Sequence, residues 1–410
     1  MTLEVTRGQR TTASAAAAPG PGRWSRLLLM IAKQIQRGTV TIVTPDGAHH
    51  RFAADKPGPE ATLVMHRERV ARRLLAGGDV PFAEAYMDGD WDSPSLTQLI
   101  ELAALNGDVV DRHLQERFWG RIVRRLMHAL HRNSKLGSRR NIAYHYDLGN
   151  DFYRTWLDAS MTYSSALFAD PKLTLEAAQR AKYIRLARML DLDPAHHVLE
   201  IGCGWGGFIE TAVASHGCRV TGITLSRAQQ AYAVRRLDQA GLAERASIRL
   251  QDYRDVEERF DRIASIEMFE AVGEAYWPTF FRVLHDRLRQ GGLAALQVIT
   301  IAEDRFEAYR QRPDFIQRYI FPGGMLPSLE RLKAIVAEVG LEWREDCSFG
   351  QDYARTLKLW GDRFLAAWPQ LNELGFDERF RRMWQYYLAY CEAGFRAATI
   401  DVRQILLARG

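Results

Sequence analysis

Three alternating glycines follow an apolar run and a glutamate in the segment Val198-Leu-Glu-Ile-Gly-Cys-Gly-Trp-Gly-Gly-Phe208. Glycine has no Cβ, so the chain can turn tightly there and a ligand can approach the main chain closely. In α/β domains such a turn joins the end of a strand to the start of a helix. The spacing therefore predicts that bare backbone at Gly202–Gly207 contacts a nucleotide-like cofactor.

The glycine spacing fits two cofactor motifs. Gly202, Gly204 and Gly207 match the dinucleotide fingerprint G-x-G-x-x-G. Glu200, followed by Gly202, Gly204 and Gly206, matches the E-x-G-x-G-x-G loop of methyltransferases that use S-adenosylmethionine. A purely structural turn is a third alternative, although three glycines between a strand and a helix rarely lack a ligand.

The residues after the loop separate these alternatives. A nicotinamide-binding unit places an Asp or Glu about 20 residues further on, where it bonds the ribose hydroxyls. Here no acidic residue lies between Glu210 and Asp238. The ribose would instead meet Thr224, Ser226 or Gln229. The pattern therefore favours S-adenosylmethionine over a nicotinamide cofactor.

The length and composition predict more than one folded unit. A chain of 410 residues is long for one core, and its 47% apolar residues with ten Trp support globular packing. No apolar stretch reaches the ~18 residues that a membrane-spanning helix needs. The cysteines lack metal-ligand spacing and indicate reduced thiols of a cytosolic enzyme. They are Cys203, Cys218, Cys347 and Cys391.

The first residues carry no pattern of a folded segment. The net charge of the chain is +5 and its pI is near 9.0. Residues 1–22 are rich in Ala, Pro and Gly and predict a disordered tail. They lack the continuous apolar region of a cleaved signal peptide, whereas the character of a transit peptide stays open.

Residues 23–112 predict a small α/β domain. Apolar residues repeat at helical spacing from Trp24 to Ile35. Thr39–Val43 and Arg51-Phe52, joined by a Pro-Asp-Gly turn, predict a hairpin. Ser95–Leu105 predicts a helix with Ser95 as its N-cap.

A basic segment with an apolar face follows at residues 113–140. Apolar residues at positions 118, 122, 126 and 130 are four apart and line one helical face, with arginines between them. Such a helix, with aromatic residues, suits an anionic membrane surface. The alternative is a linker helix that packs on the core and exposes its basic face. No motif for binding RNA or DNA accompanies the charge, which argues against a nucleic-acid partner.

From about residue 175 the chain alternates between helices and strands. The expected helices are 175–190, 207–215 and 227–240, and the expected strands are Val198–Ile201, Arg219–Leu225, Ala246–Leu250, Phe260–Glu267 and Gly292–Thr300. This alternation predicts a parallel sheet with helices on both faces. The tail from Glu303 is rich in helical pattern and aromatic residues, and we expect it to cover the mouth of the cofactor crevice.

Many ordered segments resemble those of cyclopropane-fatty-acid-phospholipid synthases. They are Asn141–Tyr153, Met161–Ser165, Val198–Phe208, Thr221–Ser226, Met268–Gly273, Tyr319–Ser328, Phe364–Pro369 and Tyr387–Arg396. The match runs from about residue 40 to the end of the chain. The wider group includes mycolic acid cyclopropane synthases and methyltransferases that build methyl-branched or furan fatty acids.

The resemblance implies an α/β fold with a class I (Rossmann-like) methyltransferase sheet at residues 141–410, of which about 303–410 form a helical acyl-chain cap. It implies that residues 23–112 form an N-terminal lipid-binding domain. It also implies S-adenosylmethionine as cofactor and a membrane phospholipid with an unsaturated acyl chain as substrate. It further implies that the protein forms a homodimer in the cytoplasm and associates peripherally with the membrane.

By motif position, the resemblance assigns the contacts of the cofactor. Tyr163 and Ser164 would contact its methionine part. The loop against it would be formed by Gly202, Gly204 and Gly206. The ribose would lie near Thr224, Leu225, Ser226 and Gln229, and the adenine near Asp252 and Tyr253.

Methylation of an alkene explains what such a site needs. An alkene is a weak nucleophile, so a methyl sulfonium must be held in line with it in a dry pocket. The transfer leaves a carbocation on the acyl chain, and a base must then remove a proton. Loss from the new methyl closes a cyclopropane, whereas loss from a neighbouring carbon leaves a methyl or methylene branch on an alkene.

In cyclopropane synthases a bicarbonate ion is held beside the reaction by a Cys, a Glu, a His, an Ile backbone and a Tyr. Glu270, Ile299 and Tyr319 match three of these positions. Ser165 stands in place of the Cys, and Gln297 in place of the His. A neutral Gln cannot relay a proton as imidazole can. Gln and Ser could still hold the ion, and Glu270 could itself act as the base.

These two departures affect ring closure more than methyl transfer. The preferred hypothesis is therefore a C-methyltransferase that gives a methyl-branched acyl chain. A cyclopropane synthase and a catalytically inactive lipid-binding homologue are the alternatives, and the intact glycines and Glu270 argue against the inactive protein.

A few further residues stand near the motifs. Cys391 and His145 are expected to be packing residues rather than a nucleophile and a base. Tyr146, Phe152 and Tyr153 are expected to line the acyl channel or to face the carbocation.

Overall fold

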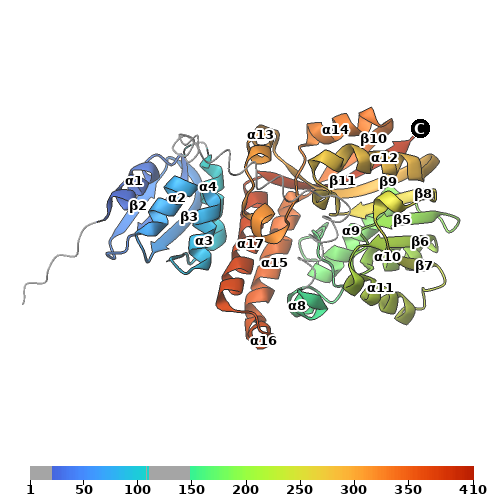
Figure 1. Ribbon diagram of the computed structural model, residues 1–410, viewed down its shortest axis with the longest axis horizontal. Helices are drawn as coiled ribbons and strands as arrows, with labels where there is room; N and C mark the ends of the chain where they lie inside the picture. Colours follow the sequence, from blue (N-terminus) through green and yellow to red (C-terminus); the bar gives the residue numbers. More distant parts are fainter. Residues whose placement is uncertain (1–20, 108, 110–147) are drawn as a thin grey trace, which may run out of the picture.

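The computed structural model describes residues 21–107, 109 and 148–410. It contains a small N-terminal α/β domain, a layer of helices and a large sheet domain, side by side in that order (Figure 1). The expected tail at residues 1–20, the basic segment at 113–140, His145 and Tyr146 lie outside the described residues. Within the described ranges, no helix is both long and apolar enough to cross a bilayer.

The small domain is built on a four-stranded sheet. Its elements are α1 (Arg23–Ala32), β1 (Arg37–Val43), β2 (His49–Ala53), β3 (Lys56–Met65), α2 (Arg69–Gly77), α3 (Asp79–Met87), β4 (Trp91–Asp92) and α4 (Leu96–Leu105). The strand order is β2-β1-β3-β4. The predicted hairpin of β1 and β2 is confirmed, and β3 runs parallel to β1. Val40, Ile42 and Leu63 face the core because side chains alternate along a strand.

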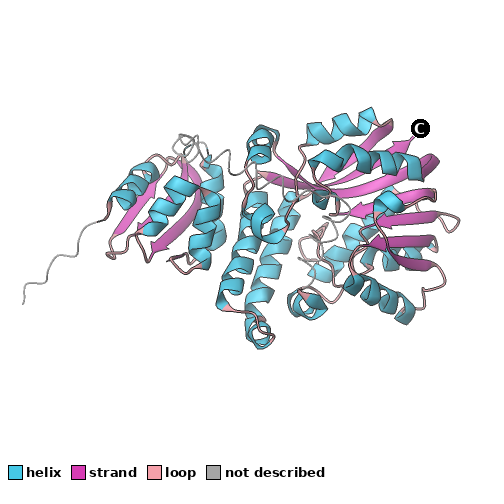
Figure 2. Cartoon of the chain, in the orientation of Figure 1, coloured by secondary structure: helices cyan, strands magenta, loops and turns pink. Residues whose placement is uncertain are grey.

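The large domain is built on a seven-stranded sheet with order β10-β11-β9-β8-β5-β6-β7. Its first elements are α8 (Gly149–Trp156), α9 (Leu175–Met189), β5 (His197–Ile201), α10 (Gly207–His216), β6 (Arg219–Thr224), α11 (Arg227–Gln239), β7 (Ala246–Leu250), β8 (Phe260–Ile266), α12 (Trp277–Arg287) and β9 (Leu288–Ile301). The strands from β5 to β9 pair in parallel, as predicted. Helices flank the sheet on both faces (Figure 2).

The end of the sheet departs from the expected helix-rich tail. Two further strands, β10 (Leu341–Ser348) and β11 (Ile400–Arg409), pair antiparallel beside β9, so the sheet is mixed rather than parallel. β11 lies between β9 and β10 and buries residues on both faces, including Val402 and Leu407. Its partner β9 ends about 100 residues earlier in the chain, so no local pattern reveals the pairing.

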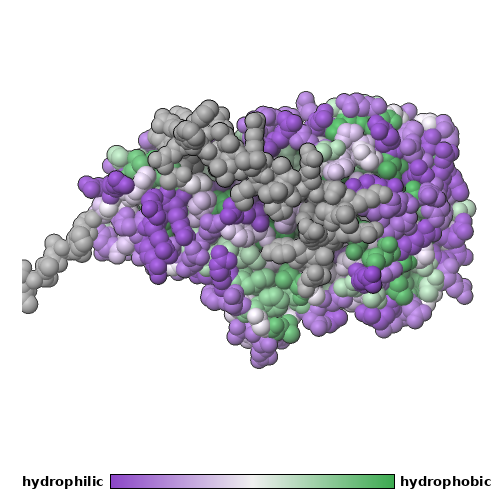
Figure 3. All heavy atoms as spheres, in the orientation of Figure 1, coloured by the Kyte–Doolittle hydropathy of each residue, from purple (hydrophilic) through white to green (hydrophobic). Residues whose placement is uncertain are grey.

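The rest of the C-terminal segment is helical, as predicted. Its elements are α13 (Glu303–Gln311), the single π-helical turn η4 (Ile316–Ile320), α14 (Leu329–Glu338), α15 (Gly350–Ala366), α16 (Trp368–Glu373) and α17 (Glu378–Arg396). Three short 3-10 turns precede it, η1 (Tyr253–Asp255), η2 (Phe269–Ala271) and η3 (Glu274–Tyr276). α15 and α17 stand between the small domain and the sheet. Figure 3 shows apolar side chains gathered toward the α16 end of this layer, where Leu365 and Leu374 are exposed.

The helical layer joins the two domains through α17. Arg382 donates to the carbonyl oxygens of Tyr86 at 2.5 Å and Trp91 at 2.8 Å, and to Asp92 Oδ1 at 2.7 Å. Thr97 on α4 donates to Glu392 at 3.0 Å. A guanidinium that satisfies two backbone carbonyls and a carboxylate makes strong, charge-assisted hydrogen bonds. These contacts fix the small domain against the helical layer.

Candidate active site

The glycine loop leaves β5 at the carboxyl edge of the sheet, where ligands bind in parallel sheets. Gly202, Gly204 and Gly206 have positive φ angles of 80°, 51° and 85°. A Cβ on Gly202 would lie 2.6 Å from Cγ of Met268, whereas a Cβ on Gly204 would meet nothing within 4 Å. Gly202 is therefore required by backbone and packing, and Gly204 presents bare main chain to the cavity. This geometry fits the nucleotide-like cofactor that the sequence predicts.

The next turn, at the end of β6, supplies the residues expected near the ribose. Thr224, Leu225 and Gln229 line the cavity. Thr224 Oγ1 donates to Gln229 Oε1 at 2.8 Å and accepts from the Ser226 N–H at 3.1 Å. Ser226 Oγ accepts from the Gln229 N–H at 3.3 Å and caps α11. The hydroxyl groups of Thr224 and Ser226 therefore stabilise this turn, and that of Ser226 also caps the N-terminus of α11.

The residues expected near the adenine follow β7. Tyr253 lines the cavity. The Asp252 carboxylate is bound by Arg254, whose Nε and Nη2 lie 2.8 and 2.7 Å from its two oxygens. The Arg254 guanidinium also lies 5.4 Å from the centre of the Tyr253 ring. Asp252 thus positions Arg254, whose guanidinium lies beside the Tyr253 ring in the cavity wall.

A cavity of about 2450 Å³ begins at the glycine loop and extends into the small domain. Most ligand pockets measure about 300–1,000 Å³, so this one has room for a cofactor and a long substrate together. The small domain lines it with apolar side chains. They include Leu28, Ile31, Val40, Ile42, Leu63 and Leu99.

Glu267 lies at the centre of the polar part of this cavity wall. It follows the last residue of β8 and has a φ of 47°, a left-handed conformation that is strained for a residue with a side chain. Its Oε1 accepts from the Ser165 N–H at 2.8 Å and from Gln297 Nε2 at 2.7 Å. Its Oε2 accepts from the Tyr353 hydroxyl at 2.6 Å. Three donors from distant segments therefore converge on one carboxylate.

The orientation of the Gln297 amide follows from its neighbours. Arg185 can only donate, and its Nη1 lies 2.8 Å from Gln404 Oε1. The Gln404 NH₂ group therefore faces Gln297 Oε1, at 3.0 Å. The Gln297 NH₂ group is left to donate to Glu267. Both glutamines are fully buried, so this chain of amides is fixed.

Lys182 supplies a positive charge beneath the same site. It is fully buried, and its Nζ donates to Ser164 Oγ at 2.5 Å. Burial lowers the pKa of Lys182 to about 7, against the opposing charges of Glu267, Asp158 and Glu200. Nζ thus binds the segment that carries Ser164, and its charge acts on Glu267 through electrostatics.

Glu270 is the second carboxylate in the wall and has fewer donors. Its Oε1 accepts from the Ile299 N–H at 2.6 Å, while its buried Oε2 has no hydrogen-bond partner in the described part of the chain. Burial, and then the charge of Glu267, raise the pKa of Glu270 to about 8. Burial also raises the pKa of Glu267, but Lys182 and the three donors oppose that shift. The three donors and the charge of Lys182 thus favour the ionised form of Glu267, whereas the burial of Glu270, with a single donor, favours its protonated form.

The groups expected to hold bicarbonate are engaged within the chain. The Ser165 hydroxyl donates to the Ala166 carbonyl oxygen at 2.9 Å, and Gln297 and the Ile299 N–H bind the two glutamates. The Tyr319 hydroxyl donates to Glu84 of the small domain at 2.6 Å. The structure thus brings Ser165 and Gln297 together on Glu267 and directs the Tyr319 hydroxyl elsewhere.

Aromatic residues divide between the cavity and the core. The Tyr163 hydroxyl lies 2.7 Å from that of Tyr387, and both residues line the cavity. Phe152 and Tyr153, expected along the acyl channel, are instead fully buried in an aromatic cluster with Trp156. Burial raises the pKa of the Cys391 thiol, which keeps it protonated and agrees with a packing role.

Several residues of the site were not identified from the sequence. Glu267 ends a predicted strand at the edge where parallel strands bind ligands, so that signal could have found it. Tyr353 and Gln404 come from segments far along the chain and carry no local signal. Lys182 lies in a predicted helix, where a solvated lysine is the ordinary expectation.

Comparison with known proteins places this geometry in context. A family model described as mycolic acid cyclopropane synthetase matches residues 133–405. Tuberculostearic acid methyltransferase UfaA1 of Mycobacterium tuberculosis is 41% identical over an alignment of 417 residues, covering 99% of this chain and 94% of that protein. The cyclopropane-fatty-acyl-phospholipid synthase of Escherichia coli is 37% identical over 341 residues, covering 83% of this chain and 85% of that protein.

A solved structure shows the same fold in the large domain. Mycolic acid cyclopropane synthase CmaA1, complexed with SAH and CTAB, is 32% identical with a TM-score of 0.62. The similarity covers 66% of this chain and 98% of that one. The α/β sheet with helices on both faces is therefore shared with a protein solved with S-adenosylhomocysteine (SAH).

Gly202→Ala tests the fit of the glycine loop. The new Cβ would meet Met268 and occupy a positive φ, so we expect a loss of about 1–3 kcal/mol in the free energy of unfolding and weaker binding of SAH. Titration calorimetry and thermal unfolding measure both effects. Gly241→Ala is the matched control, because its φ is 69° but nothing lies within 4 Å of its Cβ. Equal SAH affinity in both variants would contradict this role of the loop.

Proposed function

Since the chain belongs to the mycolic acid cyclopropane synthetase family and is an S-adenosylmethionine-dependent methyltransferase, we propose that it methylates the double bond of an unsaturated fatty acyl chain in a membrane phospholipid. We propose further that its product is methyl-branched. Glu267 carries this proposal, because the chain itself places a charged carboxylate in the wall of the cavity and holds it with three donors.

The cofactor site lies where the glycine loop meets the cavity. When bound, S-adenosylmethionine supplies a methyl group on a positively charged sulfur. Gly204 and its neighbours would receive it along the bare main chain, with Tyr163 and Ser164 on the other wall. Lys182 donates to the Ser164 hydroxyl and so orients that side chain in the wall.

The apolar part of the cavity suits the acyl substrate. Side chains from α1, β1, β3 and α4 extend the cavity away from the glycine loop, into the small domain. Burial of an acyl chain there would be favourable by about 0.8 kcal/mol for each CH₂ group. This supports a lipid-binding role for the small domain and a substrate drawn from a membrane surface.

Glu267 is the base that completes the reaction. After methylation the acyl chain carries a carbocation, and one proton must leave for a neutral product to form. The carboxylate of Glu267 can accept that proton, because its three hydrogen bonds leave one of about four acceptor sites free. Glu270 is protonated and holds the Ile299 backbone, so it supports the wall rather than acting as the base.

A base fixed on the chain favours a branch over a ring. A cyclopropane requires the proton to leave from the new methyl group, whereas a branch requires loss from a neighbouring carbon of the acyl chain. In this chain, the Gln297 amide and the Ser165 N–H bind the Glu267 carboxylate rather than a bicarbonate ion. The relative named tuberculostearic acid methyltransferase matches nearly the whole chain, which supports the same choice.

The product distinguishes the two outcomes directly. The protein is incubated with labelled S-adenosylmethionine and vesicles whose phospholipids carry monounsaturated chains, and the fatty acids are analysed by mass spectrometry and NMR. We expect label in a branched chain that retains an alkene. High-field ring protons would contradict the branched product and indicate a cyclopropane synthase. Tight cofactor binding without any transfer would indicate an inactive lipid-binding protein.

Glu267→Gln and Glu270→Gln form a matched pair that identifies the base. The first removes the charged carboxylate, so turnover is expected to fall about 100-fold or more while SAH affinity stays close to that of the wild type. The second imitates a carboxyl group that is already protonated, so it is expected to retain most activity. The reverse order of the two losses in a methyl-transfer assay would assign the base to Glu270.

Lys182→Met tests the charge assignment through the pH profile. Turnover is expected to rise with pH as Glu267 ionises. Loss of the ammonium removes a charge that lowers the pKa of Glu267, so the rise should move to higher pH. Lys182→Arg keeps the charge and should stay near the wild-type profile. A pH profile that is the same in Lys182→Met and the wild type would show that Lys182 does not lower the pKa of Glu267.

A further inference from the structure

Tyr319 lies in an unusual turn at the wall of the cavity. It belongs to η4, a single π-helical turn of the kind often found at functional sites. Its ring centroid lies 5.4 Å from that of Phe315, which in turn lies 4.8 Å from Tyr386 on α17. These contacts fix the ring and leave its hydroxyl to be directed by a hydrogen-bond partner.

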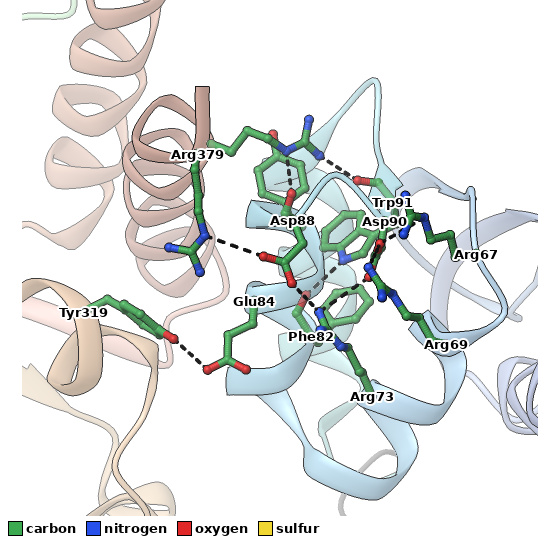
Figure 4. Close-up of polar contacts among 12 residues, drawn as sticks. Arg67, Arg69, Arg73, Phe82, Glu84, Asp88, Asp90, Trp91, Tyr319 and Arg379 are labelled. Carbon is green, nitrogen blue, oxygen red and sulfur yellow. Dashed lines mark hydrogen bonds and ion pairs between the residues drawn. The ribbon is translucent and has the colours of Figure 1, made fainter. Parts of the chain in front are cut away.

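That partner comes from the other domain. The Tyr319 hydroxyl donates to Glu84 Oε1 on α3 at 2.6 Å, across the domain boundary (Figure 4). Arg318 Nη2 lies 3.4 Å from the same oxygen and partly balances its charge. Glu84 and Tyr319 both line the cavity whose wall contains Glu267 and Glu270. A residue of the small domain therefore binds a side chain that the large domain places in the wall of this cavity.

Glu84 keeps its position because α3 is bound to α17. Arg382 donates to the carbonyl oxygen of Tyr86, and its guanidinium lies 4.0 Å from the centre of the Tyr86 ring. The Tyr86 hydroxyl donates to Gln385 Oε1 at 3.1 Å. Tyr86 is two residues from Glu84 on the same helix. These contacts hold α3 on α17 and so keep Glu84 in place beside η4.

We propose that Glu84 is a positioning residue of the reaction site, which fixes Tyr319 in the cavity wall so that the small domain completes the active site of the large one. This inference rests on the proposed function. A carboxylate that accepts the phenol hydrogen bond increases the electron density of the ring. An electron-rich ring face stabilises a cation near it, such as the carbocation on the methylated acyl chain.

The consequence is that turnover depends on the docked small domain. Glu84 acts on the reaction only through Tyr319 and does not touch the reacting carbon. The hydroxyl stays protonated, since burial and the Glu84 carboxylate raise the pKa of Tyr319. If α3 separates from η4, the hydroxyl loses its acceptor and the ring loses its fixed orientation.

The test is a double-mutant cycle on the full chain. Methyl transfer from labelled S-adenosylmethionine to dioleoyl phosphatidylglycerol vesicles is measured for the wild type, Glu84→Ala, Tyr319→Phe and the double variant. Glu84→Ala is expected to lower kcat about tenfold, with the KM for vesicles and the SAH affinity unchanged. The double variant should lose no more than Tyr319→Phe alone, because both changes remove the same contact. Glu84→Gln should recover part of kcat, since its amide oxygen still accepts the hydroxyl.

Asp88→Asn is the matched control, because Asp88 is the C-cap residue of the same helix. Asp88 binds Arg73 at 2.8 Å and lies 3.6 Å from Arg379, so it faces α17 without reaching Tyr319 (Figure 4). The kcat of the Asp88→Asn variant is expected to lie within about twofold of the wild-type value, because partly exposed ion pairs contribute little to stability.

Three results would overturn the role of Glu84. They are a wild-type kcat in Glu84→Ala, losses that multiply in the double variant, and an equal loss in Asp88→Asn. If Glu84→Ala unfolds at a lower temperature than the wild type, the kcat of Glu84→Gln, which keeps the size of the side chain, is used in its place. A wild type that transfers no methyl group would contradict the proposed function instead.

Discussion

A carboxylate held away from bulk water needs hydrogen-bond donors and a positive charge, and the large domain supplies both to Glu267. The donors are the Ser165 N–H, the Gln297 amide and the Tyr353 hydroxyl, and the charge is that of Lys182. Gln297 is oriented from β11, the antiparallel strand at the end of the chain. Loss of one partner would leave a charged group unsatisfied, at a cost of about 1–3 kcal/mol. The strand order of the sheet, α9 with Lys182 and α15 with Tyr353 therefore all contribute to one site.

The same arrangement separates the two glutamates by protonation state. Glu270 has one donor and an unpaired oxygen among the described residues, and burial raises its pKa to about 8. Glu267 has three donors and the nearby charge of Lys182, and these favour the ionised form that a base needs. Gln297, which stands where the family usually has His, binds this carboxylate through its side chain, whereas Ser165 binds it through its backbone N–H. The neutral amide of Gln297 can hold an anion but cannot relay a proton.

The features that the sequence could predict are those with a local period or a local motif. The glycine loop, the strands from Val198 to Thr300 and the hairpin near Thr39 follow from spacing and turn residues. β10 and β11 could not be predicted in the same way, because β11 pairs with β9 about 100 residues earlier in the chain, and β10 joins the sheet only through β11. The link from Tyr319 to Glu84 is longer still, and it crosses two domains. Local motifs therefore predicted the cofactor loop, whereas the proposal that Glu267 is the base depends on tertiary contacts.

The most direct test of this account is the dependence of turnover on bicarbonate. Methyl transfer to unsaturated phospholipid vesicles would be measured in buffer freed of carbon dioxide and again after bicarbonate is added. If the Glu267 carboxylate is the base, the two rates will be equal, and the rate in both buffers will be lost in the Glu267→Gln variant. A rate that rises with added bicarbonate, and that survives the loss of the Glu267 carboxylate, would contradict the account.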